Sequence, residues 1–118
     1  PLLHNVHVLP TVPGNSEFNR AQLPKSKDFI FTFPNPEIFL RFKCDIHAWM
    51  FAYVAVVNHP FFAVSGQDGS FRLSDLPGGT YTVEAWHRKA GRVTREVTVR
   101  DHESSNVDFV LEVPPPDI

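Results

Sequence analysis

Apolar and polar residues alternate along much of this chain with a period of two, the pattern of β-strands whose successive side chains point to opposite faces. In the first half, strands are predicted for residues 4–9, 28–33, 38–44 and 50–57, the first three from this alternation. The last of these is almost wholly apolar, which predicts a strand covered on both faces. Residues 10–24 carry the turn signal Pro13-Gly14-Asn15 and predict an irregular connection. Since no stretch has the period of an amphipathic helix, the sequence predicts an all-β protein.

From Asn58 onward the pattern changes to short strands separated by sharp turns. Asp68-Gly69 and Gly78-Gly79 supply the positive φ angles that tight hairpins need, and a further turn is expected at Lys89-Ala90-Gly91. The predicted strands of this half are residues 61–65, 70–73, 80–88, 92–100 and 106–113. The prolines at the end of the chain, residues 114–116, predict an extended spacer. The change of pattern therefore predicts two parts, residues 1–57 and 58–118.

The composition is that of an ordinary folded protein, with 42% hydrophobic and 20% charged residues in a chain of 118. A net charge of −2 at pH 7 gives no support for a nucleic acid or an anionic lipid as the partner. The longest apolar run, residues 48–57, is about half the length of a membrane span. Because the chain begins at Pro1 without a signal sequence, we expect a mature or truncated fragment whose targeting or anchoring segment lies upstream.

One short segment concentrates residues with metal-binding chemistry. The single Cys and the single Met of the chain, Cys44 and Met50, lie on either side of His47, and His4 lies in the first predicted strand. A thiolate and two imidazoles in a plane, with a weak axial thioether, make up a blue-copper electron-transfer site. The period of two also directs Cys44 to the apolar, inward face of its strand. The sequence therefore predicts a mononuclear metal site formed by these four residues.

Each of these residues taken alone has a simpler interpretation. Cys44 fits an inert buried thiol, His47 a surface or capping histidine, and Met50 a core side chain. Their joint spacing with His4 favours the metal site over unrelated structural roles.

The other histidines are weaker candidates for metal ligands. His7 points away from His4 in a regular strand, so it is the less favoured alternative ligand. His59 precedes Pro60 in a predicted turn, where a structural hydrogen bond suffices. His87 shares a strand face with apolar residues, which favours a structural role.

The first half resembles the cupredoxin family of small blue-copper proteins. The resemblance rests on the spacing of Cys44, His47 and Met50, and on Leu3-His4-Asn5-Val6, in which an Asn follows the His directly. It implies an antiparallel Greek-key β-sandwich of which residues 1–57 are the cupredoxin-like part. Cupredoxins have strands before the first His, so we expect these strands to lie upstream or to be replaced by the second module.

The second half resembles the carboxypeptidase regulatory-like module, a small β-sandwich domain. The residues that carry this resemblance are Phe62-Ala63-Val64-Ser65, Asp68-Gly69-Ser70-Phe71 and Leu76-Pro77-Gly78-Gly79-Thr80-Tyr81. Bacterial extracytoplasmic proteins join the two patterns in a similar way, with Asn58-His59-Pro60 and Ala85-Trp86-His87 in comparable places. The resemblance implies that residues 58–118 form this module and a proline-rich tail, which indicates a fold more than a function.

Together the two resemblances imply a periplasmic or extracellular protein that carries single electrons with one type 1 copper per chain. The copper ligands would be His4, Cys44, His47 and Met50. The backbone N–H of Asn5 would bond to the thiolate and support the site. An apolar docking patch is expected from aromatic residues that otherwise belong to the core, namely Trp49, Phe51, Phe61 and Phe62.

The expected partner is a redox protein such as a cytochrome, a copper oxidase or a membrane electron-transport complex. An upstream segment that tethers the chain to a membrane fits the same location. No enzymatic activity is expected, because the chain has no Gly-x-Ser-x-Gly motif and no evident carboxylate pair. The alternative is a non-catalytic accessory subunit of a larger complex, with a vestigial or copper-storage site.

Overall fold

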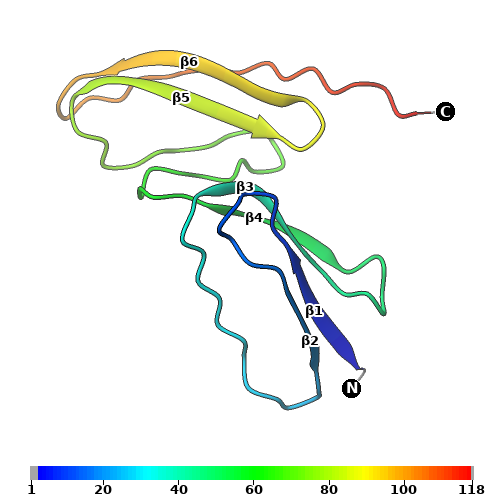
Figure 1. Ribbon diagram of the computed structural model, residues 1–118. Helices are drawn as coiled ribbons and strands as arrows, with labels where there is room; N and C mark the ends of the chain where they lie inside the picture. The colour runs from blue at the N-terminus through cyan, green and yellow to red at the C-terminus, as the bar shows by residue number, and fades with distance from the viewer. Residues whose placement is uncertain (1–2, 118) are drawn as a thin grey trace. The chain divides into compact units, whose positions relative to one another are not determined.

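The computed structural model describes residues 3–117 and consists of β-strands, turns and extended segments (Figure 1). The six strands of these residues form two antiparallel sheets. The chain divides into two compact units, Pro1–Pro60 and Phe61–Ile118. In the described part of the chain, no helix is long and apolar enough to span a membrane. The predicted all-β class with antiparallel sheets is confirmed.

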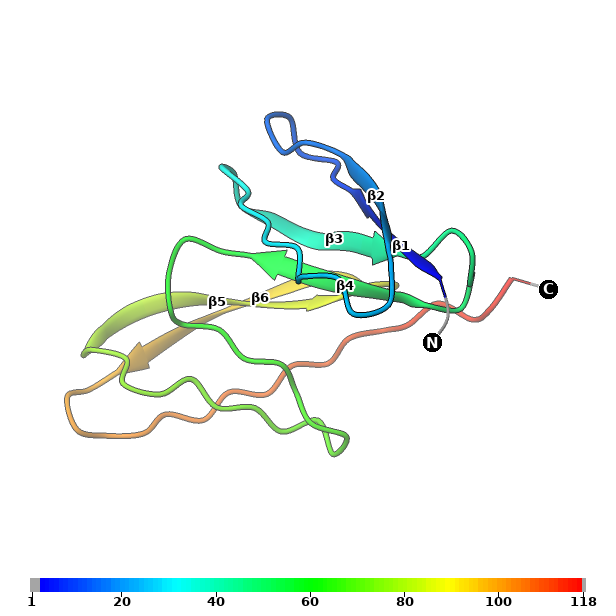
Figure 2. The ribbon, with the colours of Figure 1, turned by 90° about the horizontal axis from the view of Figure 1, so that it is seen from below.

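The first unit is built on a four-stranded sheet in the order β2-β1-β3-β4 (Figures 1 and 2). Its strands are β1 (His4–Leu9), β2 (Phe18–Gln22), β3 (Glu37–Lys43) and β4 (Phe51–Val56). Three of them lie where strands were predicted. The prediction that residues 10–24 are an irregular connection is wrong, because they contain β2. The three central residues of β2 are exposed and include no large apolar side chain, so the strand lacks the alternation that reveals a half-buried strand.

One face of this sheet carries the core of the unit. Val8 is paired with Phe18 of β2 and with Phe42 of β3, which places these three side chains on the same face. His4 shares this face because it lies an even number of residues from Val8. Val8 and Leu40 are fully buried, with 0% of their surface exposed.

The segment 28–33 was predicted as a strand, and this prediction is wrong. It packs through its aromatic rings instead of through backbone pairing. The Phe31 ring lies edge-on to Phe18 and Phe42, with centroid distances of 4.8 Å and 5.4 Å. The other two Phe rings of the segment extend this cluster. The alternation thus correctly predicted which side chains pack together. Edge-on packing of their rings stabilises the cluster.

Strand β4 is less covered than its apolar sequence predicts. Phe51 is 52% exposed and Val54 is 39% exposed, so the prediction of a strand buried on both faces is wrong. The physical reason is that β4 lies at the edge of its sheet, beside β3 alone. An edge strand has fewer neighbours to cover its side chains.

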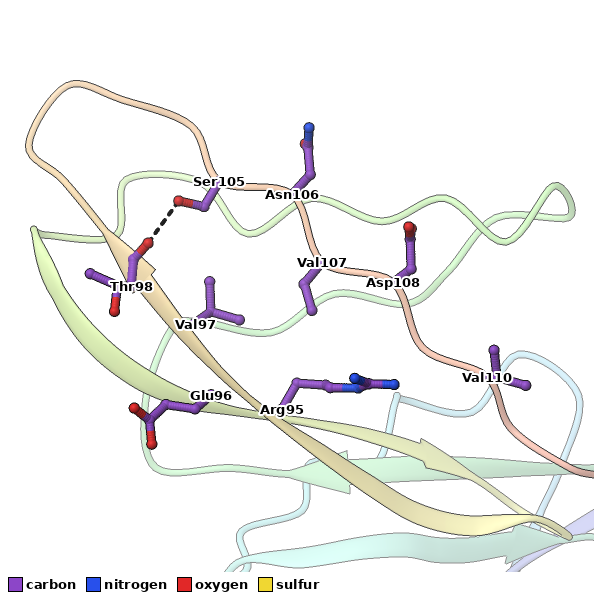
Figure 3. A pocket seen from close by; sticks show the side chains of 9 residues that line it. All are labelled: Arg95, Glu96, Val97, Thr98, Ser105, Asn106, Val107, Asp108 and Val110. Carbon is purple, nitrogen blue, oxygen red and sulfur yellow. Dashed lines mark hydrogen bonds between the residues drawn. The ribbon is translucent and has the colours of Figure 1, made fainter.

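The second unit contains a hairpin of β5 (Gly79–His87) and β6 (Gly91–Val99). The two strands and their turn lie where they were predicted, and Gly91 has a φ of 81° that suits glycine. The predicted strands at residues 61–65, 70–73 and 106–113 are not formed. The segment after β6 runs along it, tied where Ser105 Oγ donates to the Thr98 carbonyl at 2.8 Å (Figure 3). An open groove separates the segment from β6, so it makes no strand ladder there.

A buried carboxylate fixes the turn that follows β1. Glu37, at the start of β3, is 3% exposed. Its two oxygens accept the backbone N–H groups of Thr11 and Val12, each at 3.0 Å, and the Asn15 side-chain amide at 3.2 Å. Burial raises the pKa of Glu37, but these hydrogen bonds outweigh it and lower the pKa below its ordinary value.

We expect Glu37→Gln to lower the free energy of unfolding of the first unit by about 1–3 kcal/mol, because one carboxylate acceptor becomes an amide donor. Trp49 fluorescence during urea unfolding, in a Trp86→Phe background, reports on this unit. Glu112→Gln makes the same charge change at an exposed position and serves as the control. Equal midpoints for the two variants would contradict a structural role for Glu37.

Candidate metal centre

His4, Cys44 and His47 come together at one end of the four-stranded sheet. β1 runs antiparallel to β3 with His7 opposite Lys43, so the start of β1 lies beside the end of β3. This pairing joins His4 and Cys44, which are 40 positions apart. The Cys44 Sγ atom lies 3.9 Å from His4 Nδ1 and 3.7 Å from His47 Nδ1. The three side chains form a possible metal site, with their ligand atoms within 4.8 Å of one another.

The loop from Cys44 to Met50 is fixed by its own backbone and by β1. The Met50 N–H donates to the His47 carbonyl at 2.9 Å, and the Cys44 N–H donates to the Met50 carbonyl at 3.0 Å. The Asp45 N–H donates to Asn5 Oδ1 at 2.6 Å. Because both ends of the loop are held, His47 is positioned before any ligand binds.

The Cys44 sulfur is buried, with 5% of the residue exposed, and is surrounded by hydrogen-bond donors. Burial raises the pKa of the thiol. Hydrogen bonds from the Asn5 backbone N–H, the His4 ring and the backbone and ring of His47 outweigh burial and lower the pKa from 9.0 to about 6. The thiolate is the form that binds metals, so the sulfur is in its ligand form at neutral pH.

The donor set fits a transition metal such as copper. Two atoms bound to one ion at about 2.0–2.3 Å lie roughly 3.5–4 Å apart. The two sulfur–nitrogen distances of 3.7 Å and 3.9 Å agree with this spacing. Thiolate and imidazole ligands suit copper and zinc, whereas magnesium and calcium prefer oxygen ligands. The three residues could therefore hold one metal ion, such as copper or zinc, without a large rearrangement.

The fourth predicted ligand, Met50, lies at the end of the loop and is 41% exposed. Its role as an axial thioether stays a prediction. Its neighbours Trp49 and Phe51 are 75% and 52% exposed. The Trp49 ring centroid lies 5.2 Å from that of His47. An exposed aromatic side chain is thus in contact distance of a candidate ligand.

Two further residues of the predicted docking patch, Phe61 and Phe62, belong to the second unit. Phe62 is 65% exposed, and Phe61 is half-buried. The docking role of all four aromatic residues stays a prediction.

The remaining histidines of the sequence analysis lie outside this cluster. The His87 Nδ1 atom accepts the backbone N–H groups of Lys89 and Ala90, at 3.0 Å and 3.1 Å, which closes the turn between β5 and β6. Within residues 3–117, neither His59 nor His7 belongs to a possible metal cluster. The ring of His7 contacts carboxylates instead.

The polar residues around His7 were not predicted from the sequence. They are Glu17, Asn19, Lys43 and Asp45, which come from β2, β3 and the adjoining loops. No sequence motif indicates these residues, because they become neighbours only through the register of three strands. Asp45 directly follows Cys44, and this was the one available signal.

These observations define an all-β protein with a possible metal site in its first unit and a small antiparallel module in its second. Residues 50–112 match the family model of the Carboxypeptidase regulatory-like domain, and this match spans more than half of the 118 residues. The chain therefore belongs to the carboxypeptidase regulatory-like domain family. The matched residues exclude His4, Cys44 and His47, and no cupredoxin family model matches the chain. Neither the curated proteins nor the solved structures contain a match.

We expect the thiol of the metal-free protein to ionise with a midpoint near pH 6. The far-ultraviolet thiolate absorbance checks this during a pH titration, with Cys44→Ser as the blank. A lowered pKa means that ionised Cys44 stabilises the fold above the ordinary thiol pKa, and that this contribution is lost as the pH falls through about 6. His4→Asn should raise the midpoint, since the hydrogen bond from the His4 ring that lowers the pKa of the thiol is lost. A wild-type midpoint near 9.0 would contradict the role of these donors.

Proposed function

We propose that this chain is an extracytoplasmic copper protein that carries single electrons to a redox partner and has no enzymatic activity of its own. The observation that supports it most is the Cys44 sulfur between two Nδ1 atoms, with its pKa lowered to about 6. Copper held by such a set supplies a one-electron couple between Cu(II) and Cu(I). The proposal includes a single type 1 copper per chain.

In this proposal the chain's own residues hold the site rigid. His4 extends from a strand, Cys44 follows a strand, and His47 lies on a loop closed by two backbone hydrogen bonds. The Asn5 N–H donates to the sulfur and offsets part of its charge. A site that moves little when its charge changes favours fast electron transfer, and supporting contacts of this kind tune metal affinity and potential.

Met50 is the proposed axial ligand. It lies at the end of the ligand loop, where its backbone bonds to both Cys44 and His47. The spacing of these residues and the resemblance to cupredoxins support this role, together with a Greek-key sandwich as the complete form of the first part. A long axial thioether bond is weak, but it tunes the reduction potential of the copper.

The proposed docking surface surrounds Trp49, which is 75% exposed and lies beside the His47 ring. Phe51 and Ile46 are each 52% exposed and add apolar surface near the loop. The partner would be a cytochrome, a copper oxidase or a membrane electron-transport complex. A net charge of −2 favours apolar docking over strong electrostatic steering in the periplasm or outside the cell.

A second function is favoured by the family match, which covers the part of the chain without the possible metal site. The chain would then be a non-catalytic accessory subunit of a larger complex, with a vestigial or storage copper site. The small number of buried apolar residues in residues 3–117 fits a chain that is covered by partners, since the buried apolar residues there are Val8, Leu40 and Cys44.

We expect Cu(II) titration of the purified protein to give an intense thiolate-to-copper absorption band that saturates at one copper per chain. Electron paramagnetic resonance checks that the copper is mononuclear. Cys44→Ser should abolish the band, and His102→Gln, an exposed histidine outside the cluster, should leave it unchanged. Met50→Leu should keep the band and raise the potential, because loss of the thioether destabilises Cu(II) more than Cu(I).

The same titration separates the two functions. A colourless protein with weak, unsaturable copper binding would rule out the electron carrier and leave the accessory subunit. A coloured protein whose copper cannot be reduced and reoxidised would point to storage.

A further inference from the structure

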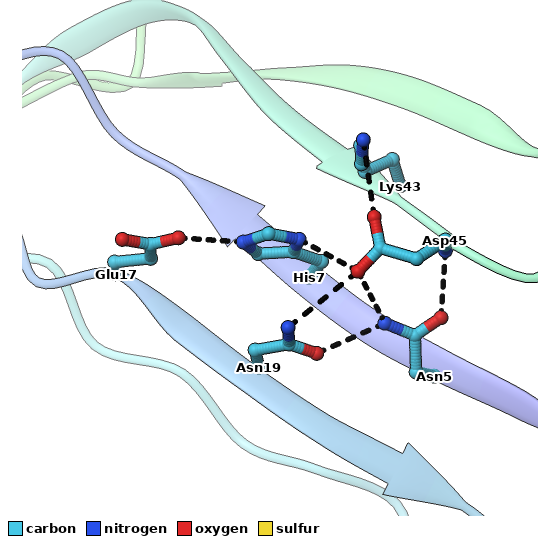
Figure 4. A network of polar contacts seen from close by, with 6 residues as sticks. All are labelled: Asn5, His7, Glu17, Asn19, Lys43 and Asp45. Atoms are coloured by element: carbon cyan, nitrogen blue, oxygen red, sulfur yellow. Dashed lines mark hydrogen bonds and ion pairs between the residues drawn. The ribbon is translucent and has the colours of Figure 1, made fainter. Parts of the chain in front are cut away.

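A network of polar side chains surrounds His7 (Figure 4). It lies on the face of the sheet opposite to the metal cluster, as the positions of His4 and His7 on β1 show. Its centre is His7, whose Nε2 atom is 2.6 Å from Glu17 Oε1 and whose Nδ1 atom is 2.9 Å from Asp45 Oδ2. His4 and His7 lie an odd number of residues apart on β1, so their side chains point to opposite faces. Both ring nitrogens of His7 are engaged, which removes it as a substitute ligand for His4.

The Asp45 carboxylate is the junction of this network. Its Oδ2 atom accepts the side-chain amides of Asn5 at 2.9 Å and Asn19 at 3.5 Å, and its Oδ1 atom lies 3.0 Å from Lys43 Nζ. These donors come from β1, β2 and β3. The contacts with Lys43 and Asn5, more than that with His7, lower the pKa of Asp45 to about 2 against the effect of burial. The carboxylate therefore joins side chains from three strands at one point.

The two ring contacts of His7 require a charged imidazole, because only the protonated ring donates from both nitrogens. The hydrogen bond to Glu17 raises the pKa of His7, burial opposes it, and Asp45 adds to it. A raised pKa means that the bridge is fully present below the ordinary value of 6.5 and is lost as the pH rises through the raised value. Protonated His7 and Lys43 then balance the charges of Glu17 and Asp45. The His7 side chain, 16% exposed, has no uncompensated charge.

We propose that His7 and Glu17 are positioning residues of the metal centre, which act through Asp45 on the loop that carries Cys44 and His47. This inference rests on the proposed metal site. Asp45 is bonded covalently to Cys44, and its N–H bonds to Asn5, the residue after His4. A shift of the Asp45 carboxylate therefore moves the backbone of one ligand and loosens its link to the strand of another.

The contacts run in sequence from Glu17 to His7 and from His7 to Asp45, and an experiment can test this order. Glu17 contacts His7, and His7 contacts Asp45, whereas no hydrogen bond or ion pair joins Glu17 to Asp45 in the network of Figure 4. The side-chain route from Glu17 to the loop therefore passes through His7. Removing His7 should make the loop insensitive to Glu17, which is a non-additive result.

We expect His7→Leu to speed hydrogen exchange of the Asp45 and Cys44 amides in the metal-free protein by about tenfold, the factor for loss of one charge-assisted hydrogen bond. Glu17→Gln should act in the same direction and less strongly, and Glu96→Gln, an exposed carboxylate of β6, is the matched control. The double variant His7→Leu/Glu17→Gln should equal His7→Leu. In the copper-loaded protein, loss of Cu(II) to excess EDTA should be faster in the same order, with affinity lowered about 10–100-fold for His7→Leu.

The outcomes separate this inference from the proposed function. If the wild-type protein binds copper and both variants match the control in exchange and copper loss, the positioning role is overturned and the metal site stands. An effect of Glu17→Gln that persists in the His7→Leu background also overturns it. If the wild-type protein has no copper site, the proposed function fails and the positioning role fails with it. Should His7→Leu not fold, Glu17→Gln alone decides, because its side chain is 62% exposed and its removal leaves no cavity.

Discussion

The antiparallel pairing of β1 with β3 is the interaction on which the candidate site depends. With His7 opposite Lys43, the first residue of β1 meets the residue that follows β3, and two candidate ligands 40 positions apart become neighbours. A register shifted by one residue would turn His4 to the other face of the sheet. The same shift would separate Asn5 from Asp45. The site therefore requires one register of β1 against β3. Burial of Val8 on the core face requires the same register.

Asn5 connects the two faces of the sheet. Its backbone N–H donates to the Cys44 sulfur on the metal side, while its side chain accepts the Asp45 N–H and donates to the Asp45 carboxylate. One residue thus stabilises the ligand charge directly and holds the ligand loop. The low pKa of the thiol and the position of the loop have the same origin, so a change that moves the loop also changes the sulfur.

Much of the candidate metal site could be predicted from the sequence, but little of the network of residues that supports it. The alternating pattern predicted β1 and β3, and the Cys–His–Met spacing with a distant His predicted the three side chains that the fold brings together. β2 was missed because its exposed, polar centre has no alternation. Residues 28–33 alternate like a strand, yet their rings pack without a ladder. The Asp45 network was unpredictable because it requires the register of three strands, which a single sequence does not provide.

Strand β4 shows that the family match extends into the sheet of the first unit. The family match begins at Met50 and so includes β4, but β4 pairs with β3 in the sheet of the first unit, with Phe51 opposite Lys43. A chain cut at the start of the match would leave β3 without a partner on that side. It would also remove the Met50 carbonyl that accepts the Cys44 N–H. The first residue of the family match, Met50, therefore closes the ligand loop through its carbonyl, and the match also includes the edge strand that pairs with β3.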